Sequence, residues 1–136
     1  MALLDTTVLV DLGRRPDSEF HRRARAQVAR LVAEGHTLFT SRINEAEFRV
    51  GPELSRDPQK ELVRVERVLA GVVILEFDAE ASLRYARIKE HLMKRGRPAG
   101  DCDMLIAAVA IANGEPLLTR NPRHFYDVPG LDVTSY

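Results

Sequence analysis

The chain has one cysteine among its 136 residues, Cys102, so it cannot form an internal disulfide. A lone thiol is typical of proteins in a reducing compartment. The sequence also lacks any apolar run close to the roughly 20 residues that a membrane-spanning helix needs. Its first residues, MALLDTTVLVDLG, contain no basic segment of the kind that opens a secretory signal. These absences predict a cytoplasmic protein with no membrane association.

Net charge is absent as well, because 20 basic side chains balance 20 acidic ones. The molecule therefore has no overall field to attract a polyanion, and any nucleic-acid binding depends on local placement of charge. The basic set consists of 17 Arg and 3 Lys. Arg recognises phosphate as a planar fork, but a biased genomic base composition explains the same excess more simply.

No internal repeat, low-complexity tract or linker divides the chain, so a single domain is expected over residues 1–136. The 45% apolar and 29% charged residues are typical of an ordinary globular protein. Short apolar runs alternate with segments of helical periodicity, which predicts a three-layer α/β/α sandwich with a mostly parallel sheet of four to five strands. Strands are expected at 2–4, 38–40, 72–77, 116–119 and 131–134, with helices at 6–12, 16–34, after Ser41, and at 57–69, 78–95 and 103–112.

Acidic and amide side chains follow several of these strands. Asp5 follows the first strand, Glu45 and Glu47 lie on the helix after the second, and Asn121 follows the fourth. Ligands of open α/β sheets bind beyond the carboxyl ends of the strands. Several carboxylates at one such edge repel one another unless a cation lies among them. An all-oxygen ligand set suits Mg²⁺ or Mn²⁺.

Helix phase decides between the two glutamates, at about 100° per residue. With Ile43 as reference, Val50 and Leu54 fall on the same apolar stripe. Glu47 lies at the margin of that stripe, at about 40°, and Glu45 lies at about 200°. Glu47 is therefore predicted to be a ligand, and Glu45 a solvated surface acid.

The acidic start of the apolar helix offers a second choice. Asp103 shares a helix face with Ala107 and Ala110, so it is predicted to point into the protein. Asp101 occupies a position where an N-cap is expected. We prefer Asp103 as the ligand and Asp101 as the cap, with Asp101 as the alternative ligand.

Four segments of the chain are similar to the motifs of one family, the PIN-domain ribonucleases of bacterial toxin–antitoxin systems (VapC-like). The first segment, LLDTTVLVDL (3–12), resembles the opening strand–Asp–helix motif of that family. The second, SRINEAEFRVG (41–51), has its acid four residues before a glycine, which is Glu47. The third and fourth motifs resemble DMLIAAVAIANGEPLLTRN (103–121), and FYDVPGLDV (125–133) resembles the usual tail.

The resemblance implies an endoribonuclease that uses Mg²⁺ or Mn²⁺. It implies that Asp5, Glu47 and Asp103 hold the metal and that Asn121 completes the catalytic set. Many members carry Asp at the Asn121 position, so this chain has one carboxylate fewer, which the nearby Asp101 could supply in part. In such a site the hydroxyls of Thr6 or Thr119 would orient the carboxylates.

The resemblance also implies partners: an RNA substrate, a cognate antitoxin protein and a second copy in a homodimer. The apolar stripes at 20–32 and 62–69 are candidate partner faces, although core packing explains them equally well. Basic residues that could position the RNA backbone are Arg14, Arg15, Arg95, Arg97, Arg120, Arg123 and His124.

Two other functions are consistent with the same residues. The chain could be a catalytically weak PIN domain that acts mainly as a protein-binding module in an antitoxin complex. A phosphatase or phosphate-binding domain would use the same sheet edge, but no Gly-rich phosphate loop follows the first strand.

Overall fold

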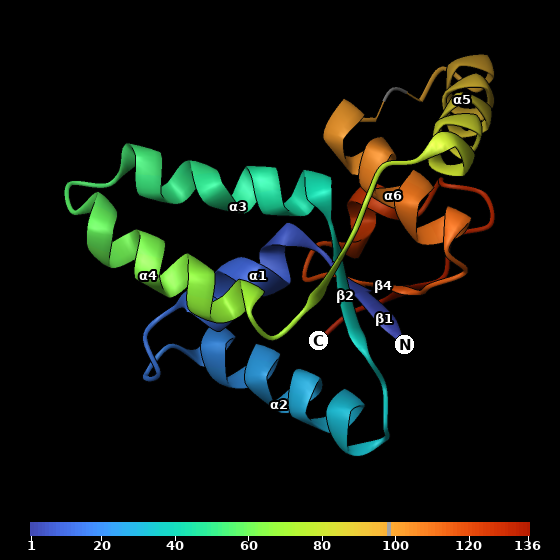
Figure 1. Cartoon of the computed structure of the whole chain (residues 1–136). Helices are drawn as coiled ribbons and strands as arrows, with labels where there is room; N and C mark the ends of the chain where they lie inside the picture. Colours follow the sequence, from blue (N-terminus) through green and yellow to red (C-terminus); the bar gives the residue numbers. More distant parts are fainter. Residues whose placement is uncertain (98) are drawn as a thin grey trace.

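A computed structural model describes residues 1–97 and 99–136 and shows a five-stranded parallel sheet between helical layers (Figure 1). The predicted α/β architecture is confirmed. The strands are β1 (Ala2–Leu4), β2 (Leu38–Ser41), β3 (Val73–Leu75), β4 (Leu117–Leu118) and β5 (Val133–Thr134). The helices are α1 (Thr6–Gly13), α2 (Glu19–Ala33), α3 (Arg42–Leu54), α4 (Pro58–Leu69), α5 (Ala79–Lys94) and α6 (Asp101–Ala112), with the short 3₁₀ helix η1 (Pro122–Phe125).

The strand order β3-β2-β1-β4-β5 places the first strand at the centre of the sheet. From β1 the chain builds outward through β2 and β3, then crosses to the other side for β4 and β5. Leu3 pairs with Phe39 on one side and with Leu117 on the other. The strand order therefore reverses between β1 and β4, and a crevice at that point is where open α/β sheets bind ligands.

Successive residues of the central strands face opposite layers, as the two-residue period of a strand requires. Leu3 and Leu117 pack with residues of α5 and α6, whereas Leu4 and Leu118 pack with residues of α1 and α4. Figure 1 shows these two groups of helices on opposite sides of the sheet. All four leucines are fully buried, so the sheet is anchored through both faces.

Helix α6 is apolar on every side and packs chiefly against α5, as the sequence predicts for a buried helix. It begins two residues earlier than expected. Gly100 is its N-cap and Asp101 is its first residue, so the predicted capping role of Asp101 is wrong. No helix in the described part of the chain is long and apolar enough to cross a membrane.

The predicted phase of α3 is also wrong. Val50 is 51% exposed and Leu54 is 81% exposed, whereas Glu45 and Phe48 are buried. Glu45 was expected to be a solvated surface acid, yet its carboxylate lies between the guanidinium groups of Arg42 and Arg49. Two ion pairs compensate the burial of its charge, and hydrophobic periodicity takes no account of such pairs.

Candidate active site

The carboxylate of Asp5 lies at the centre of the carboxyl edge of the sheet. Asp5 follows β1 directly, and its backbone N–H donates to Leu118 O of β4 at 2.9 Å. The carboxylate accepts hydrogen bonds from Thr119 Oγ1 at 2.7 Å, Thr7 Oγ1 at 2.9 Å and Asn44 Nδ2 at 3.3 Å. It caps no N–H of α1 although Asp5 is the N-cap residue. Three donors from three segments thus fix a buried carboxylate at the point where the strand order reverses.

Glu47 reaches the same edge from α3. The Thr6 hydroxyl donates a hydrogen bond to Glu47 Oε2, and Asn44 Nδ2 donates to Thr6 Oγ1 at 3.0 Å. The expected roles of Thr6 and Thr119 in orienting carboxylates match these contacts. Glu47 is half-buried. The prediction that Glu47 points to the sheet edge therefore holds, although the apolar stripe used to derive it does not face the core.

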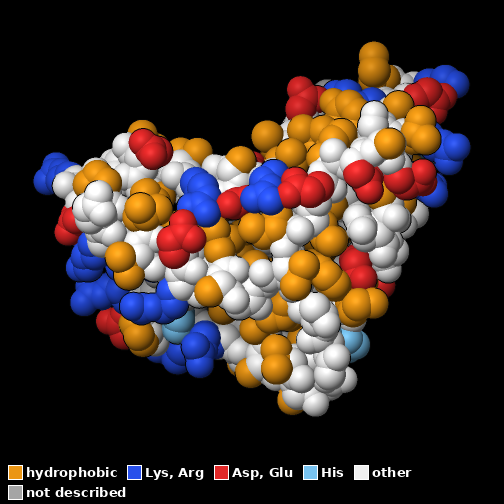
Figure 2. Space-filling model, viewed as in Figure 1, with side chains coloured by type: hydrophobic (Ala, Val, Ile, Leu, Met, Phe, Trp, Pro, Cys, Tyr) orange, Lys and Arg blue, Asp and Glu red, His pale blue; other side chains and the backbone are white. Residues whose placement is uncertain are grey.

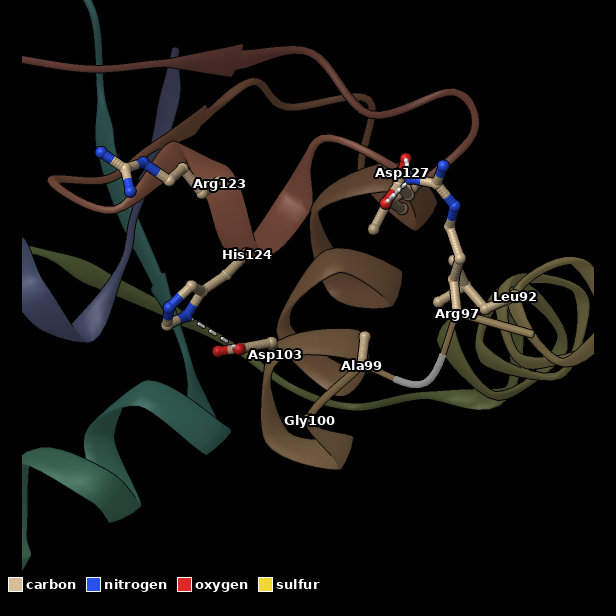
Figure 3. Close-up of a pocket in the computed structure, with 9 residues that line it drawn as sticks. Leu92, Arg97, Ala99, Gly100, Asp103, Arg123, His124 and Asp127 are labelled. Carbon is tan, nitrogen blue, oxygen red and sulfur yellow. Dashed lines mark hydrogen bonds and ion pairs between the residues drawn. The ribbon is translucent and has the colours of Figure 1, made fainter. Parts of the chain in front are cut away.

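Asp103 approaches from the first turn of α6, and Asp103 Oδ2 lies 3.2 Å from His124 Nδ1 of η1. Beside this pair lies a cavity of about 310 Å³ (Figure 3). His124 points toward Asp103, while Arg123 points away from it. At the other end of the cavity, Arg97 and Asp127 form an ion pair at 3.0 Å. The wall next to Asp103 is therefore polar and charged.

The three carboxylates act on one another electrostatically. Partial burial raises the pKa of Glu47, and the negative charges of Asp5 and Asp103 raise it further, against the hydrogen bond from Thr6. Burial likewise raises the pKa of Asp103, with His124 opposing and Asp5 adding to the effect. Such a set favours a compensating cation.

Asp101 does not belong to this set. Its carboxylate accepts hydrogen bonds from Lys89 Nζ at 2.8 Å and Tyr85 OH at 3.3 Å, both on α5. The side chain is 72% exposed. Lys89 keeps the pKa of Asp101 low. Asp101 therefore faces α5, and the prediction that it could replace or supplement Asp103 as a ligand is not supported by this geometry.

Asn121 is exposed at the start of η1, where it is the N-cap residue without a side-chain cap. Its backbone N–H donates to Thr119 Oγ1 at 3.1 Å, and the same hydroxyl donates to the Asp5 carboxylate. Asn121 thus follows β4 at the carboxyl edge of the sheet, which is the edge that the sequence predicts for it. Among the described residues, its side chain makes no hydrogen bond to the three carboxylates.

The residues present suit a hard divalent cation by the chemistry of their donors. Asp5, Glu47 and Asp103 supply carboxylate oxygens, which Mg²⁺ and Mn²⁺ prefer. Over residues 1–97 and 99–136, however, no three His, Cys, Asp or Glu side chains are arranged closely enough to hold a metal ion together. In this arrangement Glu47 is bonded to Thr6 and Asp103 is paired with His124.

Sequence reasoning missed one residue of the site, Asn44. It is fully buried and joins Ser41 in a reciprocal capping box at the start of α3. Its Nδ2 group contacts both Asp5 and Thr6, so it links two of the carboxylates. The Ser41-x-x-Asn44 spacing is the signal that could have revealed it, because that spacing is typical of a capping box.

The PIN domain family model matches residues 2–131. The chain belongs to the PIN domain family. It is 31% identical over 133 residues to "Ribonuclease VapC1" of Rickettsia felis, covering 96% of this chain and 92% of that protein. It is 25% identical over 134 residues to "tRNA(fMet)-specific endonuclease VapC" of Salmonella typhimurium, covering 98% and 96%. This PIN domain also matches the structure of DNA-bound VapBC from Salmonella typhimurium with a TM-score of 0.84, at 26% identity, over 99% and 98% of the two chains. The resemblance to VapC-like PIN domains is confirmed.

Proposed function

We propose that this PIN domain is a metal-dependent endoribonuclease that acts as the toxin of a toxin–antitoxin pair. The observation that carries the proposal is that the carboxylates of Asp5, Glu47 and Asp103 gather at the point where the strand order reverses. The charges of Asp5 and Asp103 raise the pKa of Glu47, and the charge of Asp5 raises the pKa of Asp103. The names of the relatives, "Ribonuclease VapC1" and "tRNA(fMet)-specific endonuclease VapC", support RNA as the substrate.

In this proposal the three carboxylates hold Mg²⁺ or Mn²⁺. Bound there, the metal would activate water and stabilise negative charge on the scissile phosphate. The chain itself contributes rigidity. Asp5 has three hydrogen-bond donors, and Thr6 orients Glu47. The groups that donate hydrogen bonds to Asp5 come from α1, α3 and the end of β4. Its carboxylate is therefore held in a fixed orientation before any substrate binds.

Asn121 is proposed to act on the substrate rather than on the metal. It is exposed, and the hydrogen bond from its backbone to Thr119 holds it at the edge of the site. A neutral amide can donate a hydrogen bond to a phosphate oxygen without adding negative charge. This assigns Asn121 the fourth catalytic position, with three carboxylates left for the metal.

The proposed partners are a cognate antitoxin protein and a second copy of the chain. The structural relatives are VapBC complexes of toxin with antitoxin, which supports the first partner. The exposed apolar residues of α3, Val50 and Leu54, and of α5, Leu83, favour a protein contact. The homodimer stays a prediction.

The test is cleavage of RNA by the purified protein with Mg²⁺, with Mn²⁺ and with EDTA, using initiator tRNA and total RNA as substrates. Cleavage is expected only with metal and is expected to be lost in Asp5→Asn and in Asp103→Asn. Asp101→Asn is the matched control, because it removes the same charge from the same helix turn but faces α5. Activity that survives Asp103→Asn and is lost in Asp101→Asn would contradict the assigned ligands.

The same experiment separates the enzyme from a binding module. A partner-free wild-type protein that cuts none of these RNAs with either metal contradicts the proposed activity. Binding of the antitoxin protein by that inactive wild type, retained in Asp5→Asn, would instead support a PIN domain that serves as a protein-binding module.

A further inference from the structure

A buried carboxylate outside the proposed site organises one face of α1. Asp11 is fully buried, and its Oδ1 accepts a hydrogen bond from Arg14 Nε at 2.8 Å. Its Oδ2 accepts from Tyr136 OH at 2.7 Å and lies 3.4 Å from Arg120 Nε. One carboxylate therefore holds two arginines from distant parts of the chain, leaving a net positive charge.

Phe20, the second residue of α2, contacts the same two arginines through its ring. The guanidinium carbon of Arg120 lies 4.5 Å from the centre of its ring, and that of Arg14 lies 5.5 Å from it. Phe20 is 39% exposed, so this aromatic ring is not a core residue. We call Arg14, Phe20 and Arg120 the arginine–phenylalanine stack. Aromatic rings and arginine planes held in this way are surfaces that bind single-stranded RNA.

The stack begins next to the proposed active site. The backbone N–H of Arg120 donates to Thr7 Oγ1 at 3.0 Å, and Thr7 Oγ1 donates to Asp5. Thr7 and Asp11 are spaced i and i+4 on α1, and Arg14 is the C-cap residue that follows the helix, so these contacts extend from the first turn of α1 to its C-terminal end. Seven residues of helix span about 10 Å, the length of about three stacked nucleotides at roughly 3.4 Å each.

A basic pocket continues from the far end of the stack. It has a volume of about 350 Å³ and lies between the α1–α2 loop, α2 and α4. Its arginines are Arg14, Arg15, Arg25, Arg64 and Arg67. Arg14 and Arg64 pair with Asp11 and Glu61, but within the described residues no carboxylate forms an ion pair with the other three. Figure 2 shows basic side chains gathered on the side of the molecule that carries α4 and this loop.

We propose that the arginine–phenylalanine stack and the basic pocket form one track that binds the phosphate backbone of the RNA substrate and leads it to Asp5. This inference rests on the proposed function. A strand that reaches three carboxylates is repelled by them, and the molecule has no net positive charge to offset this. The track supplies local positive charge that starts at Arg120, whose backbone is joined to Asp5 through the Thr7 hydroxyl. This continuity with the proposed catalytic carboxylate favours RNA over an acidic protein segment as the occupant.

The experiment measures binding of a fluorescently labelled single-stranded RNA at several salt concentrations in EDTA, where the proposed cleavage does not occur. Each phosphate contact contributes about 0.7 to the slope of log affinity against log salt for a single strand. Arg14→Gln and Arg67→Gln are each expected to lower that slope by about this amount. Phe20→Leu keeps the charges but removes the ring, and is expected to weaken binding about two- to fivefold.

Arg30→Gln is the matched control. It removes one positive charge from the last turn of α2, beside the amino ends of the strands, where Arg30 pairs only weakly with Glu34. Its slope is expected to equal that of the wild type. Arg120 is tested with Arg120→Gln and with Arg120→Lys, because the lysine variant keeps a positive charge beside the buried Asp11 carboxylate and so separates loss of RNA binding from loss of folding. Substitution of a residue of the track is expected to raise the KM for RNA by a larger factor than it lowers kcat.

The outcomes of the two proposals are distinguishable. Wild-type protein that binds RNA through the track but does not cut it contradicts the proposed function and leaves the track intact. Cleavage with unchanged slopes and KM in Arg14→Gln and Arg67→Gln overturns the track. So does a loss of antitoxin binding in these variants without any change in RNA binding, which would assign the surface to the protein partner.

Discussion

Thr119 Oγ1 donates a hydrogen bond of 2.7 Å to the carboxylate of Asp5, across a separation of 114 residues. Both residues follow central strands directly, β4 and β1, and both are buried. The contact lies at the point where the strand order reverses, and it joins the carboxyl ends of the neighbouring strands β1 and β4. The geometry of the proposed metal ligand is therefore a consequence of sheet topology.

Replacing Thr119 by valine is expected to cost about 1–3 kcal/mol of stability, because a buried carboxylate loses a short hydrogen bond. It is also expected to lower RNA cleavage about 10- to 100-fold, the usual effect of losing a group that orients a metal ligand. Urea unfolding and cleavage rates measure the two effects. Thr119→Ser keeps the hydroxyl and is expected to retain most of the activity; equal loss in both variants would indicate a packing role only.

Asn44→Ala removes the side chain that contacts both Asp5 and Thr6. We expect a stability loss of about 1–2 kcal/mol from the lost capping box and a fall in cleavage, because Thr6 then lacks the donor that orients it. Asn113→Ala is the control. Asn113 Nδ2 bonds to Val109 O at the end of α6, away from the carboxyl edge. It is expected to lower stability without lowering activity.

The sequence allowed the positions of Asp5 and Asp103 to be predicted because both depend on local rules. An acid directly after a buried central strand lies at the sheet edge wherever that strand pairs in parallel. An acid on the inner face of an apolar helix points toward the core side. The α/β order of elements followed from the same local periodicity, and the element boundaries differ from the predicted ones by a few residues at most.

The network around Asp11 could not be predicted in this way. Tyr136 OH and Asp11 Oδ2 are joined across 125 residues, and Arg120 reaches the same carboxylate from the end of β4. No periodic pattern marks such contacts, because they depend on which strand ends become neighbours. The predicted buried face of α3 was wrong for a related reason. Its buried side holds Asn44 and Glu45 as well as Phe48 and Pro52, so polar contacts help to stabilise a face that apolar periodicity alone does not identify.

Glu47→Gln is expected to stabilise the metal-free protein while abolishing metal-dependent cleavage. The raised pKa of Glu47 means that folding disfavours its charged form, so near neutral pH the negative charge lowers stability. The amide removes repulsion from Asp5 and Asp103 and still accepts the hydrogen bond from Thr6. Thermal unfolding in EDTA is expected to show a Tm a few degrees higher than that of the wild type.

The same variant tests whether the site binds metal. Ligand that binds only the folded state stabilises it by about 1.4 kcal/mol at ten times its Kd. Mg²⁺ or Mn²⁺ is therefore expected to raise the Tm of the wild type and to have a much smaller effect on Glu47→Gln. An equal rise in Tm for both proteins would show that the stabilising metal binds elsewhere.

Glu45→Gln separates the two glutamates of α3 that lie two residues apart. The Glu45 carboxylate is buried between Arg42 and Arg49 and faces away from the acidic set. Loss of its charge is expected to cost about 1–2 kcal/mol, less than for a fully buried pair because both arginines keep contact with solvent. Cleavage by the folded protein is expected to remain unchanged.

Glu53→Gln is the control, because Glu53 is exposed on the same helix. This substitution is expected to change stability by no more than about 0.5 kcal/mol. Unfolding curves and cleavage rates of the three proteins decide the matter, and a loss of cleavage in Glu45→Gln at unchanged stability would place Glu45 in the site instead of in the framework of α3.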